Sequence, residues 1–274
     1  MPLASGLDSR DNDMPRFLLL SALLLGGFPF CTDASSVLQS PAPSQLAFSA
    51  TELDAHSEQT WRTRLSEEAR AKSLGCRRYC ERIARIFARL ATAASRIADA
   101  PSIHWQLAIG TSAREGAWAL SGGRVYVSEA LIDKYELTDD ELAFVLGHEM
   151  GHALLQHENE ALTVAAAFVP RAVSQSVSSM YAELDFDLGL VLKLQPELQA
   201  EEFEADHAGM LLGGAAGFDP DGMLHFLEAL ALDSNSTSPL ISTHPQAAER
   251  YQRAIAVRYS AQVLRNSSTH GVTN

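Results

Sequence analysis

Residues 138–157 read TDDELAFVLGHEMGHALLQH, a stretch that predicts one capped helix carrying two histidines on the same face. Thr138 and Glu141 have the spacing of a capping box, in which each side chain accepts a hydrogen bond from the other residue's backbone N–H. His148 and His152 lie four residues apart, so both imidazoles project from one side of the helix. Both imidazoles can therefore reach a single metal ion.

The two histidines form part of an HExxH pattern, in which Glu149 follows the first histidine. A tetrahedral zinc ion can accept both imidazole nitrogens. Glu149 lies about 100° round the helix from its neighbour. Its carboxylate can therefore reach a water at the metal, whose pKa zinc lowers to about 7, and take the proton. The alternative is a helix with two exposed polar histidines, because a bare HExxH pattern also occurs by chance.

A third ligand decides between these alternatives, and His157 is the nearest candidate. It follows His152 by five residues, whereas the metzincin pattern needs a glycine three residues and a histidine six residues after the second histidine. His157 is therefore more simply interpreted as a residue at the helix end.

The segment EEFEAD, residues 201–206, supplies carboxylates at helical spacing. Glu202 and Asp206 share one helix face, so Glu202 can complete a His2Glu zinc site that leaves a fourth position for water. Asp206 can accept a hydrogen bond from the far nitrogen of a ligating histidine and fix its orientation. Glu201 and Glu204 are rival ligands on other faces, and an ordinary acidic helix face is the alternative for the whole segment.

Two glycines inside the HExxH helix indicate close packing. Gly147 and Gly151 each cost roughly 1 kcal/mol of helix propensity relative to alanine. We expect another element to approach the helix closely at these positions, and a second helix that bears a zinc ligand is the best candidate.

The rest of the chain predicts a mainly helical α+β protein, a zincin-like metallopeptidase domain with a small β-sheet beside the HExxH helix. We expect strands at 103–109 and within 116–128, and helices at 56–98 (broken near Gly75), 129–135, 139–157, 199–213, 220–232 and 246–264. The expected organisation is an N-terminal extension and signal peptide at 1–34, a linker at 35–55, the metallopeptidase domain at 56–265 and a flexible tail at 266–274.

The N-terminal residues predict export. Arg16 precedes an apolar run at 17–28, and a polar stretch of small residues follows, with a suitable cleavage position after Ala34. The run is short for a membrane span, which needs about 20 apolar residues. An uncleaved anchor is the alternative, and Met14 is an alternative start.

Charge and cysteine content narrow the class further. The net charge of −13 argues against a nucleic-acid partner. Residues 62–96 are nevertheless basic, with ten Lys/Arg against three Asp/Glu. This stretch could contact acidic lipid or the acidic body of the protein, although a solvated helix face is the simpler interpretation. Cys76 and Cys80 lie one helical turn apart, so we interpret them as packing residues, with a disulfide as the alternative.

Several motifs in order resemble the HtpX and CaaX-prenyl-protease group of zinc metallopeptidases (gluzincins), and within it the exported BepA-like and LoiP-like branch. The resemblance covers about residues 70–260. It rests on GRVYV at 123–127, DELA at 140–143 leading into HEMGH at 148–152, EFEAD at 202–206, AGFDP at 216–220, and STHP at 242–245 with Arg250.

The resemblance implies roles for four parts of the chain. It makes Glu202 the third ligand, and it makes residues 116–121 a strand that binds the substrate backbone as an added strand. It places His244 near the metal, where the imidazole can regulate the site or occupy the open position, although a helix start is the plainer reading of the following proline. It also places Arg250 near the site, in support of the oxyanion or of the fold.

The sequence thus predicts a zinc-dependent metalloendopeptidase with one Zn²⁺ per chain, held by His148, His152 and Glu202, with Glu149 as general base. By resemblance, its partners are misfolded or unassembled envelope proteins in the periplasm, with possible contact to a membrane surface. The alternatives are a chaperone-like adaptor whose metal site is held shut by His244 or by residues 161–198, and a helix bundle without metal.

Overall fold

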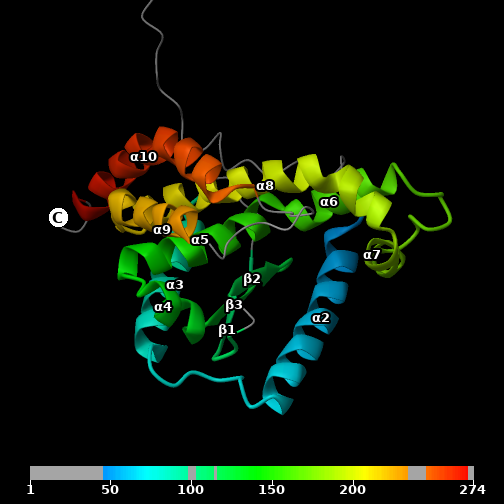
Figure 1. The fold of residues 1–274 in the computed structure, drawn as a ribbon, viewed down its shortest axis with the longest axis horizontal. Helices are drawn as coiled ribbons and strands as arrows, with labels where there is room; N and C mark the ends of the chain where they lie inside the picture. The colour runs from blue at the N-terminus through cyan, green and yellow to red at the C-terminus, as the bar shows by residue number, and fades with distance from the viewer. Residues whose placement is uncertain (1–45, 98–102, 114–115, 234–244, 271–274) are drawn as a thin grey trace, which may run out of the picture. The chain divides into compact units, whose positions relative to one another are not determined.

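Helix α5 (Asp139–Leu155) lies at the centre of the main hydrophobic core in the computed structural model (Figure 1). Nearly all of its residues after Glu141 are buried, as expected for a helix that is apolar on every side. The structure describes residues 46–97, 103–113, 116–233 and 245–270, all within one unit that spans 32–274. The signal peptide expected at 1–34 and His244 lie outside these residues.

The described elements make a mainly helical α+β fold. The helices are α2 (Ala50–Arg70), α3 (Cys80–Ala94), α4 (Glu129–Tyr135), α5, α6 (His157–Ala166), α7 (Val177–Phe186), α8 (Leu188–Ala215), α9 (Pro220–Leu232) and α10 (Ala247–His270). The strands are β1 (Gln106–Gly110), β2 (Ala117–Leu120) and β3 (Arg124–Ser128). None of these helices is long and apolar enough to cross a membrane.

The sheet places one edge strand beside α5. Its order is β1-β3-β2, with β1 parallel and β2 antiparallel to the central strand β3. All five residues of β3 are buried, whereas β2 is an edge strand, with a neighbouring strand on one side only among the described residues. β2 packs against α5, so the free edge of the sheet faces the HExxH helix (Figure 1).

The predicted start of α5 is confirmed, but its predicted end is wrong. Thr138 and Glu141 form both hydrogen bonds of the capping box. At the other end Gln156 adopts a left-handed conformation, with φ 60° and ψ 31°. The chain turns there, and α6 begins at His157 instead of continuing α5.

Helices α5 and α8 cross in close contact, and the glycine-based prediction is confirmed. A Cβ atom on Gly147 would lie 3.0 Å from the backbone oxygen of Gly209 in α8. A Cβ atom on Gly151 would lie 3.2 Å from the backbone oxygen of Ala205 in the same helix. Glycine at these positions lets the backbones of the two helices approach each other.

The break expected near Gly75 is confirmed, because α2 ends at Arg70, α3 begins at Cys80, and Gly75 lies between them at φ 113°. Two other boundaries differ from the prediction. Helix α2 begins at Ala50, inside the expected linker 35–55, and Asp54 and Glu58 on it bind the buried Arg124 at 2.7 and 2.9 Å. Helix α10 runs to His270, so the tail expected from residue 266 is helical at its start.

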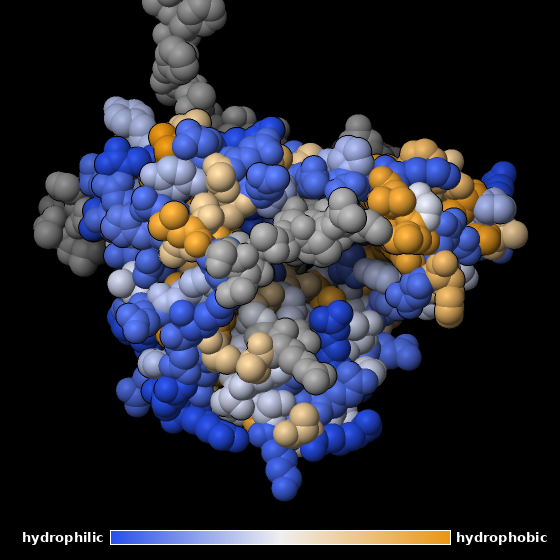
Figure 2. Space-filling model, viewed as in Figure 1, coloured by the Kyte–Doolittle hydropathy of each residue, from blue (hydrophilic) through white to orange (hydrophobic). Residues whose placement is uncertain are grey.

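Helices α6 and α7, which the sequence did not predict, form a second, smaller core with α2 and the start of α8. This core contains Leu162, Met180 and Leu190. On the outer surface Phe186 and Leu188 are 91% and 57% exposed, in the apolar area over α7 and the start of α8 (Figure 2).

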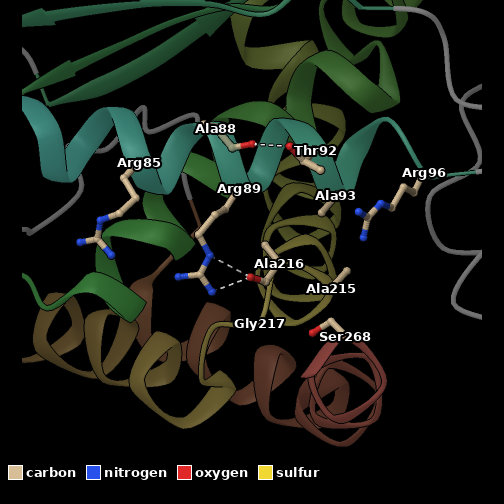
Figure 3. A pocket seen from close by; sticks show the side chains of 10 residues that line it. All are labelled: Arg85, Ala88, Arg89, Thr92, Ala93, Arg96, Ala215, Ala216, Gly217 and Ser268. Carbon is tan, nitrogen blue, oxygen red and sulfur yellow. Dashed lines mark hydrogen bonds between the residues drawn. The ribbon is translucent and has the colours of Figure 1, made fainter. Parts of the chain in front are cut away.

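Arg89 ties α3 to the end of α8. Its guanidinium donates to the backbone oxygen of Ala216 through Nε at 3.1 Å and Nη2 at 2.6 Å (Figure 3). The same group lies 3.8 Å from the centre of the Phe218 ring. Other arginines of the basic stretch bind the acidic body directly, as Arg82 and Arg85 do at Asp139, 2.5 and 2.9 Å away.

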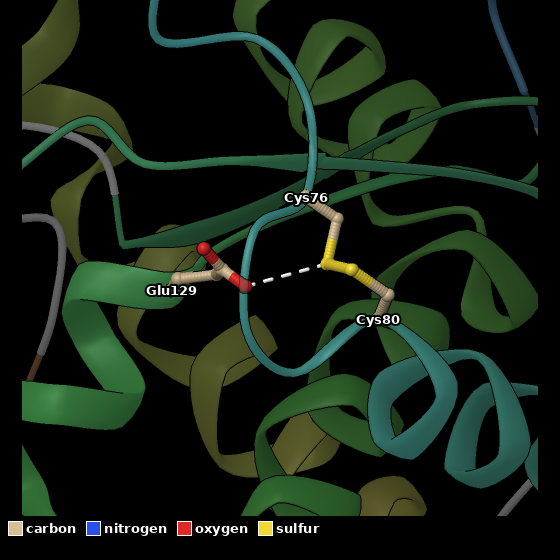
Figure 4. Close-up of side chains that lie close together, drawn as sticks. All are labelled: Cys76, Cys80 and Glu129. Atoms are coloured by element: carbon tan, nitrogen blue, oxygen red, sulfur yellow. Dashed lines mark hydrogen bonds between the residues drawn. A yellow bond between two sulfur atoms is a disulfide. The ribbon is translucent and has the colours of Figure 1, made fainter.

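Cys76 and Cys80 form a disulfide, so the interpretation as packing residues of one helix is wrong (Figure 4). Only Cys80 lies in α3, and Cys76 belongs to the loop before it. Buried Glu129 lies beside this loop and accepts hydrogen bonds from the backbone N–H groups of Arg77, Arg78 and Tyr79. Its Oε1 is also 3.3 Å from Sγ of Cys76, a contact without a hydrogen because that sulfur is oxidised.

Candidate metal centre

Three potential ligands from two helices meet where α5 crosses α8. Nε2 of His148 lies 3.2 Å from Nε2 of His152. The two oxygens of Glu202 lie 3.5 Å from these nitrogens, Oε2 from His148 and Oε1 from His152. The close α5–α8 contact at the glycines sets this distance between the helices. The structure thus brings together the three residues that the sequence predicted as ligands.

The donor set fits a zinc ion. Zinc binds histidine nitrogen and carboxylate oxygen at 2.0–2.2 Å, so neighbouring ligand atoms of a tetrahedral site are about 3.3–3.5 Å apart. The two imidazole nitrogens are 3.2 Å apart, close to that value, and each lies 3.5 Å from one of the two oxygens of Glu202. Two imidazoles and one carboxylate are also the ligand types of a catalytic zinc site.

Asp206 and Arg250 lie beside His148, and Nη1 of Arg250 is also 3.6 Å from Oε2 of Glu202. Nδ1 of His148 lies 2.9 Å from Oδ1 of Asp206. Arg250 on α10 donates to both oxygens of that carboxylate, at 2.6 and 2.8 Å. If Nδ1 of His148 donates to the carboxylate, Nε2 keeps its lone pair for the metal.

This arrangement keeps Asp206 ionised. Burial by itself raises the pKa of Asp206, but hydrogen bonds from Arg250 and His148 outweigh it and hold the pKa below its ordinary value. The pKa of His148 is raised without metal, because the hydrogen bond to Asp206 and the charge of Glu202 outweigh the opposing effect of burial. Metal binding at His148 therefore competes with protonation of the same ring.

Glu149 faces a cleft beside these ligands. The cleft is bounded by β2 on one side and by α6, α7 and α8 on the other; Ala117–Leu120, His148, Glu149, His152, Ala161, Leu162, Tyr181, Leu184, Leu198 and Glu202 line it. The carboxylate that the sequence assigned to proton transfer therefore lies in the same cleft as the three ligands and the free strand edge.

The rival ligands lie apart from the three-residue group. Glu201 lines the cleft, and burial together with the negative charges of Glu197 and Glu160 raises its pKa to about 9. Glu204 is 60% exposed and lies 3.5 Å from Nε2 of His157. Neither belongs to the group formed by the two histidines and Glu202.

His157 is the feature of the site that sequence reasoning missed. It is only 2% exposed, and its Nδ1 lies 2.9 Å from Nδ1 of His152. The five-residue spacing carries no signal of this contact on a continuous helix. Only the left-handed turn at Gln156 brings the two rings together, and nothing in the sequence marks a glutamine for that conformation.

The comparisons with known proteins agree with the geometry. The family model described as Peptidase family M48 matches residues 78–257. Metalloprotease LoiP of Escherichia coli (strain K12) is 32% identical over 155 residues, which cover 54% of this chain and 60% of LoiP. The beta-barrel assembly-enhancing protease of Yersinia pestis is 30% identical over 143 residues, 47% of this chain and 29% of that protein.

A plant relative lies at similar distance. Mitochondrial metalloendopeptidase OMA1 of Arabidopsis thaliana is 28% identical over 159 residues, 54% of this chain and 30% of that protein. The match to these three relatives thus spans between 29% and 60% of their length. The resemblance inferred from the motifs is confirmed, and the family match covers most of the described fold. The chain belongs to peptidase family M48.

Proposed function

We propose that this protein is a zinc-dependent metalloendopeptidase that holds one Zn²⁺ with His148, His152 and Glu202. The observation that carries the proposal is the convergence of the three donor groups at 3.2–3.5 Å, within a cleft that Glu149 also lines. When bound, zinc supplies a Lewis acid that polarises a peptide carbonyl and makes water more acidic.

Glu149 performs the proton transfers in this proposal. Its carboxylate lies in the cleft, next in sequence to one ligand and one helical turn before the other. It accepts a proton from the attacking water and then delivers it to the nitrogen of the leaving amine. Glu149 needs no place among the metal ligands for this role.

Asp206 and Arg250 support the ligand His148. Asp206 accepts the hydrogen bond from Nδ1 of His148, and Arg250 neutralises the buried carboxylate. Arg250 is 8% exposed, and its Nε and Nη2 donate to Asp206 while Nη1 lies 3.6 Å from Oε2 of the proposed ligand Glu202. These contacts favour a supporting role for Arg250 over direct stabilisation of an oxyanion. For His244 the proposal stays the one that the resemblance implies, a ring near the metal that can occupy the open position.

The substrate in this proposal is an extended, unfolded polypeptide. The free edge of β2 can pair with a substrate backbone as an added strand, which places one peptide bond beside the ligands. Leu162, Leu184 and Leu198 give the opposite wall of the cleft an apolar character. Apolar side chains are exposed in unfolded proteins and buried in folded ones, so this wall favours unfolded substrates.

The biological role and location are also proposals. The named activity of one relative in β-barrel assembly and the predicted export signal support misfolded or unassembled envelope proteins as substrates. They also support a periplasmic location, and the basic stretch at 62–96 leaves contact with a membrane surface as part of the proposal.

The test compares cleavage of unfolded casein by the wild type, Glu149→Gln and the control Glu228→Gln, an exposed glutamate on α9. We expect one zinc per chain in all three and a 10²–10⁴-fold loss of cleavage in Glu149→Gln alone. Equal cleavage by Glu149→Gln and the wild type would disprove the role of Glu149. Zinc without cleavage in any variant would favour a chaperone-like adaptor, and absence of zinc would favour a metal-free bundle.

A further inference from the structure

His157 contacts the metal ligand His152 from the side opposite the metal. The two Nδ1 atoms are 2.9 Å apart, a distance at which one of them must donate a hydrogen to the other. Nε2 of His152 points the other way, 3.2 Å from Nε2 of His148. His157 is 2% exposed, so water does not compete for this contact.

The contact between His157 and His152 requires an unfavourable backbone conformation at Gln156. On an uninterrupted α-helix a residue five positions after His152 would lie about 140° round the axis and point away from it. The left-handed conformation of Gln156 ends α5 and starts α6 one residue later. For a residue with a side chain this conformation is unfavourable by roughly 1–2 kcal/mol. The strain is offset by structure that fixes His157 against His152.

The proposed zinc site decides which nitrogen donates. A histidine that binds metal through Nε2 carries its hydrogen on Nδ1. Nδ1–H of His152 must then donate to Nδ1 of His157, which accepts only when the hydrogen of His157 sits on Nε2. Oε2 of Glu204 lies 3.5 Å from that Nε2, which makes no hydrogen bond to the described residues at this distance, and a small shift of the exposed Glu204 side chain would form one.

We propose, on the basis of the zinc site proposed above, that His157 is a positioning residue of the metal centre. Its Nδ1 holds His152 in the tautomer and orientation that turn Nε2 toward the metal. Asp206 orients His148 in the same way. The two imidazole ligands are therefore oriented by different kinds of acceptor, a carboxylate for His148 and a neutral imidazole for His152.

His157 could instead belong to a second cation site, and the tautomer of its ring distinguishes that use from the positioning role. The ligand atoms of His157, Glu160 and Glu204 lie within 4.8 Å of one another, as a second cation site would require. A cation on Nε2 of His157 needs the lone pair of that nitrogen, whereas the positioning role needs a hydrogen there. The two uses therefore exclude each other when His152 binds zinc.

The experiment measures the zinc dissociation constant of the full chain by competition with a chelator. His157→Leu removes the acceptor, and His157→Asn retains a carbonyl oxygen near the position of Nδ1. Asn159→Leu is the matched control, because Asn159 is also buried on α6 but donates to the backbone of Phe48, away from the metal. We expect zinc affinity to fall 10–100-fold in His157→Leu, to recover largely in His157→Asn and to stay unchanged in Asn159→Leu.

A second measurement needs no variant. In ¹⁵N-histidine NMR of the zinc-loaded wild type, we expect His157 as the Nε2–H tautomer and His152 as the Nδ1–H tautomer. Three results would overturn the positioning role. They are an unchanged zinc affinity in His157→Leu, equal losses of zinc affinity in His157→Leu and His157→Asn, and a second zinc per chain that depends on His157. Failure of the wild type to bind zinc would instead overturn the proposed function, which keeps the two failures distinguishable.

Discussion

Asp206 joins the candidate metal centre to the C-terminal helix α10 through its hydrogen bonds with His148 and Arg250. It is 1% exposed and binds both His148 and Arg250. A buried charge without a partner is costly, whereas the same charge in a bidentate pair with arginine is well satisfied. The orientation of His148 and the docking of α10 therefore depend on the same pair of side chains.

Removing Arg250 should damage stability and metal binding together. Arg250→Met keeps the side-chain length but leaves Asp206 as an uncompensated buried charge, so we expect a loss of about 3–5 kcal/mol in the free energy of unfolding. We also expect weaker zinc binding, because Asp206 then holds His148 less firmly. Urea denaturation in the presence of a chelator measures the loss of stability without any contribution from zinc binding.

Arg253→Met is the matched control for this prediction. Arg253 is on the same helix, but its side chain is 53% exposed, pairs with Glu249 at 2.9 Å on the surface, and lies 3.7 Å from the centre of the Phe203 ring, which methionine can also cover. Exposed pairs contribute about 0–1 kcal/mol, so this variant should unfold within 1 kcal/mol of the wild type. A comparable loss in the two variants would show that the pair with Asp206 has no special importance.

At the scale of elements, the crossing of α5 and α8 sets the distance between the ligands. A Cβ atom on Gly209 would lie 2.7 Å from the backbone nitrogen of His148, which cannot move aside without moving α5. We expect Gly209→Ala to cost about 2–3 kcal/mol of stability, as other overpacked sites do. We also expect at least a tenfold loss of zinc affinity, measured by chelator competition, because Glu202 moves away from the histidines.

A second glycine of the same helix gives the contrast. A Cβ atom on Gly189 would meet only the side-chain oxygen of Asp187, at 3.0 Å, so this side chain must shift by a few tenths of an ångström while it keeps its hydrogen bond from the N–H of Leu190. Alanine is the better helix former by up to about 1 kcal/mol, so Gly189→Ala should be neutral or slightly stabilising. Equal zinc affinity in the two alanine variants would refute the link between helix spacing and ligand spacing.

Glu129 fixes the loop that precedes α3, and its effect should depend on pH. Burial by itself raises its pKa, but backbone hydrogen bonds from Tyr79, Arg78 and Arg77 outweigh it and hold the pKa below the ordinary value. A lowered pKa in the folded state gives stability that is present above about pH 4.5 and lost as the pH falls. Glu129→Gln should therefore lose about 1–3 kcal/mol at pH 7 and differ less from the wild type at pH 4.

Thermal denaturation at pH 7 and pH 4 measures this difference, with Glu81→Gln as the control because Glu81 is an exposed residue in the first turn of α3. The control should match the wild type at both pH values. A difference between Glu129→Gln and the wild type that stays constant with pH would contradict the role of the carboxylate charge.

Sequence reasoning predicted the features of the helices that depend on residues nearby in the chain. The capping box at Thr138 and Glu141 sets the start of α5, and side-chain spacing alone places both histidines on one face. Gly147 and Gly151 even indicated a close neighbour, because their cost to the helix needs an explanation. Each of these signals lies within a few residues of its effect.

The parts that sequence reasoning missed have causes that lie elsewhere in the chain. The end of α5 depends on Gln156, which adopts a left-handed conformation only because α6 packs back on the site. The contact of His157 with His152 follows from that turn. The pairing of Cys76 with Cys80 required knowing that α3 starts at the second cysteine and not before the first.

At the scale of the whole described unit, charge is divided between two regions. Arg82 and Arg85 of α3 both bind Asp139 at the start of α5, so part of the basic stretch is paired within the protein itself. Carboxylates gather instead between α6 and α8, where burial and the charges of Glu197 and Glu204 raise the pKa of Glu160 and Glu201. The same two helices form one wall of the cleft, so this acidic group should make the protein sensitive to pH near the site.

Glu160 gives the sharpest test of that sensitivity. Burial, followed by the charges of Glu204 and Glu197, raises its pKa from 4.5 to about 7. A carboxyl group with a raised pKa in the folded state binds more protons there than in the unfolded state, so stability falls as the pH rises from about 4.5 to 7. Each pKa unit corresponds to about 1.4 kcal/mol, but Glu160 keeps part of its surface in water, and screening reduces the effect to about 1 kcal/mol.

Glu160→Gln removes the ionisable group, so we expect its Tm to exceed that of the wild type by about 2–4 °C at pH 8 and to equal it at pH 4.5. Differential scanning calorimetry of the full chain measures both values, and Glu228→Gln on the far-removed helix α9 should show no difference at either pH. If Glu160→Gln were instead less stable than the wild type at pH 8, the carboxylate would have to be stabilised there by a cation, and the acidic group between α6 and α8 would be a binding site after all.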